Sequence, residues 1–198
     1  MLLRIEQSER EYAADRNGLS ELLSFLEDYE DNSKNILVGF KVNGEEVYDD
    51  LKTVLEMRLS EVEEVEVLTE TPEDHLKGML LSSYDYIENA KRTVMTLSKK
   101  FYLGGRDESW SMLSNLMDGI GWLMQTAGMV DHSEFLLSLV DREVWNRYYV
   151  NILELGELLG NIISAAEIRD TVLIADYLRY EAEPVLGKSL LELENLLS

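Results

Sequence analysis

Hydrophobic positions in the first 70 residues switch between strand spacing and helix spacing. Leu3 and Ile5 alternate with charged residues, a pattern typical of a half-buried strand. Asn17-Gly18 predicts a break in the chain, and residues 19–29 then repeat leucine on one helical face. The sequence therefore begins with a strand followed by an amphipathic helix.

The strongest β pattern follows at residues 36–48. Ile36, Val38, Phe40 and Val42 alternate, and Asn43-Gly44 has the composition of a two-residue type I′ turn before a returning strand at 45–48. We expect Asp49 or Asp50 to cap a helix over residues 51–59, and valines at 62, 65 and 67 predict a last strand. Residues 1–70 are thus predicted to form a small β-α-β-β-α-β module.

From residue 71 onward the spacing is helical. Thr71-Pro72-Glu73-Asp74 combines a capping side chain, a first-turn proline and two acids, which marks a helix start and a domain boundary. The helix that follows carries a seam spaced by threes and fours: Leu76, Leu80, Ser83, Ile87, Ala90, Val94, Leu97 and Phe101.

Later breaks divide residues 71–198 into further helices. Gly104-Gly105 ends the first helix, residues 107–127 carry a broad apolar stripe, and residues 134–140 form a short helix. A longer helix runs to about residue 166, Arg169-Asp170 interrupts it, Pro184 limits the next one, and residues 188–197 form the last. The predicted fold class is α+β, with the 1–70 module followed by a four- or five-helix bundle over 71–198.

The charge of the chain is strongly negative. The 198 residues include 18 Lys and Arg and 39 Asp and Glu, a net charge of −21. A field of this sign repels nucleic acid and anionic lipid and favours basic protein partners. It also favours solubility, which is the simpler interpretation.

Composition also limits the cellular setting. No apolar run is long enough to cross a bilayer, and the N-terminus is charged too early for a signal peptide. The chain has no cysteine, which excludes disulfides, thiolate nucleophiles and Cys-ligated metals. We expect a cytoplasmic protein with no membrane partner.

Catalytic and metal-binding motifs are absent from the sequence. A di-iron bundle needs two Glu-x-x-His motifs, but Pro72 and Met129 stand three residues before His75 and His132. Calcium-loop, phosphate-loop and nucleophile-elbow motifs are missing as well. We therefore predict no catalytic residue, no metal site and no cofactor.

A small-ligand or enzymatic site remains the alternative. Carboxylates and tyrosines gather toward the C-terminus and can divide acid and base work if their pKa values differ. The residues are Asp170, Asp176, Tyr177, Tyr180, Glu181 and Glu183. A solvated acidic face is the simpler interpretation of these residues.

One segment is basic against the overall charge. It is a candidate patch for an anion or an acidic partner: Lys91, Arg92, Lys99, Lys100 and Arg106. The competing interpretation is that these cations stabilise a helix C-terminus and attract the molecule's own acids.

Aromatic and methionine side chains of the helical part suggest an interface. Trp, Tyr and Met are enriched at protein–protein contacts, although a bundle core also needs their volume. The candidate interface residues are Trp110, Met117, Met124, Tyr148 and Tyr149. Gly119, Gly121, Gly156 and Gly160 inside helices indicate close helix–helix approach, within the chain or between subunits.

The segment from Asp170 to Leu186 contains the stretch Asp176-Tyr-Leu-Arg-Tyr180 and the pair Glu183-Pro184. It resembles uncharacterised proteins of Gram-positive bacteria. This resemblance implies a bacterial cytoplasmic setting. The acidic helical bundle is also similar, at the level of fold class, to flagellar and type III export chaperones.

The sequence thus favours a non-enzymatic protein-interaction factor, an adaptor, chaperone-like or regulatory protein that acts through its helical bundle. A protein partner is expected, and a homo-oligomer is a further hypothesis.

Overall fold

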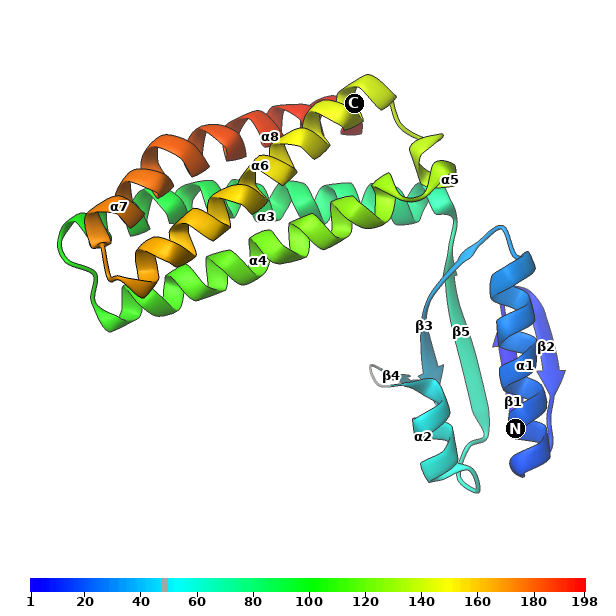
Figure 1. The fold of residues 1–198 in the computed structure, drawn as a ribbon. Coiled ribbons are helices and arrows are strands. Elements are labelled where there is room, and N and C mark those ends of the chain that lie inside the picture. Colours follow the sequence, from blue (N-terminus) through cyan, green and yellow to red (C-terminus); the bar gives the residue numbers. More distant parts are fainter. Residues whose placement is uncertain (48–49) are drawn as a thin grey trace. The chain divides into compact units, whose positions relative to one another are not determined.

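The computed structural model describes residues 1–47 and 50–198, which form two compact units, Met1–His75 and Leu76–Ser198 (Figure 1). The first unit contains a mixed sheet and two helices, and the second is helical. The predicted α+β class is confirmed.

The N-terminal unit is a five-stranded sheet with two helices on one face. Its elements are β1 (Leu2–Ile5), β2 (Ser8–Glu11), α1 (Arg16–Asn32), β3 (Ile36–Val42), β4 (Glu45–Val47), α2 (Leu51–Arg58) and β5 (Glu64–Glu70). The strand order is β2-β1-β5-β3-β4, with β1 and β5 parallel and the other neighbours antiparallel.

Leucines of both helices cover the buried face of this sheet. Leu22 of α1 and Leu55 of α2 are fully buried, together with Leu3 and Val65 from the central strands. Because strand side chains alternate, the residues between them point to the other face.

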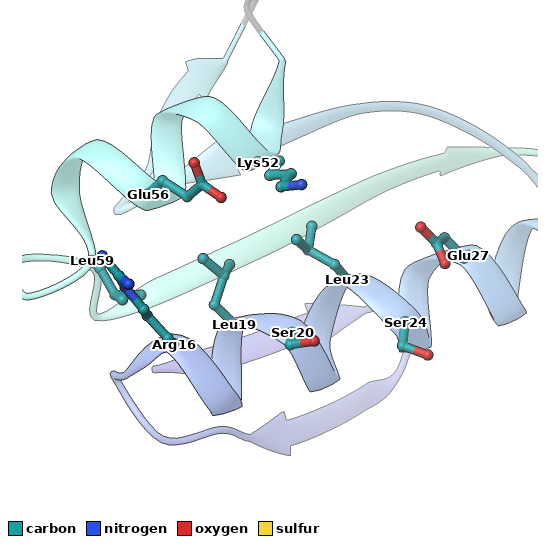
Figure 2. A pocket seen from close by; sticks show the side chains of 9 residues that line it. All are labelled: Arg16, Leu19, Ser20, Leu23, Ser24, Glu27, Lys52, Glu56 and Leu59. Atoms are coloured by element: carbon teal, nitrogen blue, oxygen red, sulfur yellow. The ribbon is translucent and has the colours of Figure 1, made fainter.

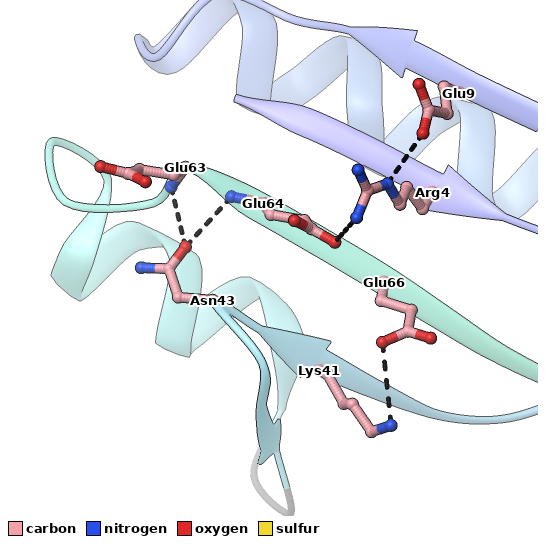
Figure 3. A network of polar contacts seen from close by, with 7 residues as sticks. All are labelled: Arg4, Glu9, Lys41, Asn43, Glu63, Glu64 and Glu66. Carbon is pink, nitrogen blue, oxygen red and sulfur yellow. Dashed lines mark hydrogen bonds and ion pairs between the residues drawn. The ribbon is translucent and has the colours of Figure 1, made fainter.

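Charged side chains cover that opposite face of the sheet (Figure 3). Arg4 of β1 contacts Glu9 at 2.9 Å and Glu64 at 2.6 Å, and Lys41 of β3 lies 3.7 Å from Glu66. These pairs join β2, β1, β5 and β3 in sequence, so cations and acids on this face contact each other across neighbouring strands.

The structure confirms the predicted hairpin and adds one strand that the sequence did not predict. Asn43 and Gly44 have φ values of 51° and 83°, as a type I′ turn requires. Tyr48 and Asp49, which the sequence placed in the returning strand and at a helix cap, lie outside the described residues, and Asp50 is the cap of α2. The strand β2 was not predicted, because all four of its side chains are exposed and show no hydrophobic alternation.

The predicted chain break at Asn17-Gly18 is wrong. Both residues lie in the first turn of α1, whose cap is Asp15; the Asp15 carboxylate accepts a hydrogen bond from the Gly18 N–H at 2.9 Å. Glycine is required there for packing, because a Cβ on Gly18 would lie 2.1 Å from the Ala13 carbonyl oxygen.

The second unit consists of four long helical segments and one short helix within the described residues. They are α3 (Pro72–Tyr102), α4 (Asp107–Asp131), α5 (Glu134–Leu137), α6 (Arg142–Glu167) and a last segment made of α7 (Thr171–Asp176), the π-helix η1 (Tyr177–Ala182) and α8 (Glu183–Leu197). All eight residues of the predicted α3 seam, from Leu76 to Phe101, are buried. The seven apolar residues of this seam join one continuous core with residues of α4, α6 and α8.

Pro184 does not end a helix, contrary to prediction. It lies in the first turn of α8, directly after the π-helix, where the Glu183 N–H bonds to the Leu178 carbonyl five residues back. This wider turn shifts the backbone hydrogen bonds by one residue. Pro184, which has no N–H, therefore lies in the first turn of α8, where an N–H would have no partner within that helix. Across residues 1–47 and 50–198, no helix has the length and apolarity that crossing a bilayer requires.

Candidate functional site

The five predicted basic residues do not form one patch. Lys91 and Lys100 are nine positions apart on α3, which places them on opposite sides of the helix. Lys91 contacts Glu183 of α8 at 3.5 Å, and Lys100 contacts Glu108 of α4 at 3.1 Å. These two cations therefore join neighbouring helices of the bundle.

The remaining three are exposed. Arg92 bonds within its own helix, to Glu88 at 3.1 Å and to Asn89 at 2.9 Å. Lys99 and Arg106 form no ion pair with any described residue. Of the five predicted basic residues, these two are the ones without an ion-pair partner among the described residues.

Tyr148 belongs to the core, which corrects its assignment to an interface. Only 2% of it is exposed, its ring lies 5.5 Å from that of Trp145, and burial raises its pKa to about 12. Tyr149 is half-buried and stacks on the Trp145 ring with 6.3 Å between the ring centroids, while the Trp145 indole N–H donates to Asp131 at 3.0 Å. These aromatic residues fix the junction of α4, α5 and α6.

Trp110 and Met117, by contrast, line a groove between α4 and α6. Ile163 and Ala166 of α6 form the other apolar wall, and the volume of the groove is about 690 Å³. Charged residues complete the lining: Asp107, Glu167 and Arg169. We call this feature the α4–α6 groove.

Local structure on both sides holds the groove in shape. Gly104 and Gly105 have positive φ values and turn the chain from α3 into α4, so that Trp110 meets Phe101 edge-to-face at 5.0 Å. On the other wall, Arg169 has a φ of 54° and ends α6. The ring of Trp110 is therefore oriented before any ligand arrives.

The helix-interior glycines divide into two groups, as the sequence left open. A Cβ on Gly119 or on Gly156 would lie within 2.5 Å of Tyr86 or Met124 respectively, so these two glycines allow helix packing inside the chain. Gly121 and Gly160 have no neighbouring atom within 4 Å of a built Cβ.

The two open glycines are not in the lining of the groove, but each lies on the helix face of one lining residue. Gly121 lies four residues after Met117, and Gly160 lies three residues before Ile163, so each shares a helix face with a residue of the lining. Met124, the fifth predicted interface residue, fills the space over Gly156 instead.

Sequence reasoning missed Ile163 and Ile168. Their side chains are 44% and 73% exposed. The available signal was position: Ile163 follows Gly156 and Gly160 by seven and three residues, which predicts a shared face of α6. Without the neighbouring helix, that face could not be told from core.

The carboxylates and tyrosines of the alternative hypothesis lie at the surface. Tyr102 donates a hydrogen bond to Asp176, which raises the pKa of Tyr102, and Tyr180 stands beside this pair. Tyr102 and Tyr180 are 41% and 65% exposed. Within residues 1–47 and 50–198, no Asp or Glu is classed as buried, and no three His, Asp or Glu side chains are grouped to hold a metal ion.

The other acids of this segment have structural partners or face solvent. Asp170 caps α7 by accepting from the Leu173 N–H at 3.0 Å, and Glu183 pairs with Lys91. Glu181 is exposed, and Tyr177 is half-buried against the bundle core.

Comparison with known proteins gives one match. The family model described as "Domain of unknown function (DUF8042)" matches residues 78–190, more than half of the chain. This range contains α4, α6 and the whole α4–α6 groove. No curated protein and no solved structure matches the chain.

Proposed function

We propose that this chain, which belongs to the family of unknown function DUF8042, is a non-enzymatic protein-interaction factor that binds an amphipathic helix of another protein in the α4–α6 groove. The observation that carries the proposal is the apolar lining of the groove, with Trp110 and Met117 facing Ile163 and Ala166. We place this activity in the cytoplasm, in an adaptor-like or chaperone-like role.

A helix suits the groove because of its shape. A channel between two neighbouring helices runs along their axes, and helix-in-groove binding places apolar side chains at spacings of three and four into such a channel. No neighbouring atom lies within 4 Å of a Cβ built on Gly121 or Gly160, so the backbone of a third helix can approach these helix faces closely. Met117 has three rotatable side-chain bonds and adapts to different apolar partners.

Charge selects a basic partner over a second copy of this chain. The net charge of −21 makes two copies repel, and in the groove lining the acids Asp107 and Glu167 outnumber the one cation, Arg169. A helix with Lys or Arg beside its apolar face would contact these acids, and its association rate would fall as salt rises. A homodimer through this groove would instead bring like charges together.

Site-specific photo-crosslinking tests the occupant directly. A photoreactive phenylalanine analogue replaces Ile163 inside the groove or, as the control, Val150, which is 60% exposed on α6 outside the groove. Position 163 should crosslink to an amphipathic segment with basic residues, identified by mass spectrometry, and position 150 should not.

Affinity of the crosslinked partner gives the second measurement. Ile163→Asp should weaken its binding about tenfold or more, because a carboxylate would have to be desolvated against apolar side chains, whereas Val150→Asp should leave binding unchanged. Equal effects of the two variants, or crosslinks from position 163 to a second copy of the chain, would contradict the proposal.

A further inference from the structure

The N-terminal unit has a groove of its own, between α1 and α2 (Figure 2). Its volume is about 830 Å³. Leu19 and Leu23 of α1 point into it, and Leu59 lies at one end. This second groove lies outside residues 78–190, the range that the family model matches.

Polar residues of both helices form its walls. The wall from α1 contains Arg16, Ser20, Ser24 and Glu27, which follow one another at helical spacings of three and four. The wall from α2 contains Lys52 and Glu56, one turn apart. Opposite charges therefore alternate along the groove in Figure 2, in the order Arg16, Glu56, Lys52 and Glu27.

None of these four charged side chains has an ion-pair partner among residues 1–47 and 50–198. Four other cations of the same unit are engaged: Arg4, Lys41 and Arg58 pair with glutamates, and Arg10 lies 4.0 Å from the centre of the Phe25 ring. Lys34, like the two cations of the groove, has no ion-pair partner among the described residues.

The contrast with the opposite face of the sheet is informative. There the charges of Arg4 and Lys41 are matched across strands, as Figure 3 shows. In the groove, Glu56 of α2 and Arg16 of α1 lie on different walls and form no ion pair with each other. The groove thus contains charged side chains of both signs that lack ion-pair partners, beside the apolar side chains of Leu19 and Leu23.

We propose that the α1–α2 groove is a second docking site, for a partner helix whose polar edges carry acidic and basic side chains in alternation. Apolar side chains of that helix would pack on Leu23 and Leu59, which are half-buried, and its charges would pair with the four that lack ion-pair partners. The α1 wall spans 12 residues, from Arg16 to Glu27. This corresponds to about 16 Å and therefore to about three turns of a docked helix.

Charge pattern separates this partner from that of the helical bundle. A basic helix would be repelled by Arg16 and Lys52, and an acidic helix by Glu27, Glu56 and the net charge of the chain. A helix with both signs avoids both repulsions. Two docking grooves in two units would make the chain a bivalent adaptor, yet neither proposal requires the other.

Three synthetic helical peptides of about 15 residues test the assignment. Each is stapled, labelled and given the same leucine face; one has alternating Glu and Lys at its polar edges, one only Lys and one only Glu. Fluorescence anisotropy with the full-length protein should show the mixed peptide binding about fivefold or more tightly than either of the others.

Variants then locate the binding site. Ser20→Trp blocks the groove from an exposed position and should weaken binding of the mixed peptide at least about tenfold, whereas Glu21→Trp, on the neighbouring exposed residue outside the groove, should not. Lys52→Glu should weaken binding roughly fivefold, and Lys34→Glu, the same charge change outside the groove, should have no comparable effect.

Equal binding of the three peptides, no binding of the mixed one, or insensitivity to Ser20→Trp would overturn the assignment. Ile163→Asp should not alter binding of the mixed peptide, because Ile163 belongs to the other groove. The proposal for the α1–α2 groove and the proposal for the α4–α6 groove can therefore be refuted independently of each other.

Discussion

Two glycines of α4, two positions apart, should respond in opposite ways to the same substitution. Gly119 leaves space for the ring of Tyr86, whose hydroxyl oxygen lies 2.2 Å from the place that a Cβ would occupy. Gly121 has no atom within 4 Å of that place. Gly119→Ala and Gly121→Ala are therefore a matched pair that differs only in tertiary packing.

The expected magnitudes follow from three terms. Alanine gains about 1 kcal/mol over glycine inside a helix at either position. At Gly119, forcing the Tyr86 ring away costs about 1–3 kcal/mol, and losing its hydrogen bond to the Leu116 carbonyl, 2.9 Å long, costs about 1 kcal/mol more. Gly119→Ala should thus destabilise the helical unit by about 1–3 kcal/mol, while Gly121→Ala should stabilise it by up to about 1 kcal/mol.

Tryptophan fluorescence during urea unfolding measures this unit selectively, because all three tryptophans, Trp110, Trp122 and Trp145, lie within Leu76–Ser198. A double-mutant cycle with Tyr86→Ala isolates the packing term. Once the ring is gone, Gly119→Ala should become neutral or stabilising. If both alanine variants shift the unfolding midpoint in the same direction by the same amount, the packing argument is wrong.

Three further substitutions test local features of the fold by urea unfolding. Burial raises the pKa of Tyr148 to about 12, whereas a tyrosine of the unfolded chain ionises near 10; the unfolded state thus binds fewer protons between these values. Stability should therefore be intact below about pH 10 and fall by about 1.4 kcal/mol by pH 11, and Tyr148→Phe should remove this part of the loss. Asp170→Ala should cost about 1 kcal/mol through its lost hydrogen bond from the Leu173 N–H, and Asp170→Asn much less. Gly44→Ala should cost about 1–2 kcal/mol, because φ is 83° there, and Gly44→Asn should recover most of it.

Part of the fold was predictable because local patterns determine it. The α3 seam requires only the helical period, and every residue predicted for it is buried. The Asn43-Gly44 turn requires only residues that tolerate positive φ. At β2 the same reasoning fails, since an edge strand with four exposed side chains has no hydrophobic alternation.

Glycine and proline marked a turn at Gly44 and a helix start at Pro72 as predicted, but the same residue types misled at two other positions. Gly18 and Pro184 both lie inside regular helical structure, where a cap and a π-helical turn accommodate them. At Gly18, the backbone of Ala13 lies too close to leave room for a side chain, which explains why this residue is a glycine. A breaker in the sequence therefore indicated a special backbone position without showing that the chain ends an element there.

The candidate site was predictable in composition only. Trp110 and Met117, two of the candidate interface residues, are half-buried at the groove, while Tyr148, of the same interface-prone type, is buried. The basic residues of α3 illustrate the same limit, since Lys91 and Lys100 find acids on two different helices. Which side chain meets which neighbour depends on helix rotation, and rotation is set by packing of the whole core.

The sequence by itself determined the acidic charge, the lack of cysteine chemistry, the α+β class and the apolar face of each long helix, because these depend on residue types and on spacings within a turn or two. Tertiary structure alone decided which faces remain uncovered. Packing of the whole unit sets the distance between two helix axes, and with it whether facing side chains leave a groove, as between Trp110 and Met117 of α4 and Ile163 of α6. The same rule left Arg16 and Glu56 unjoined between α1 and α2, because the distance between two helix axes is a property of the packed chain.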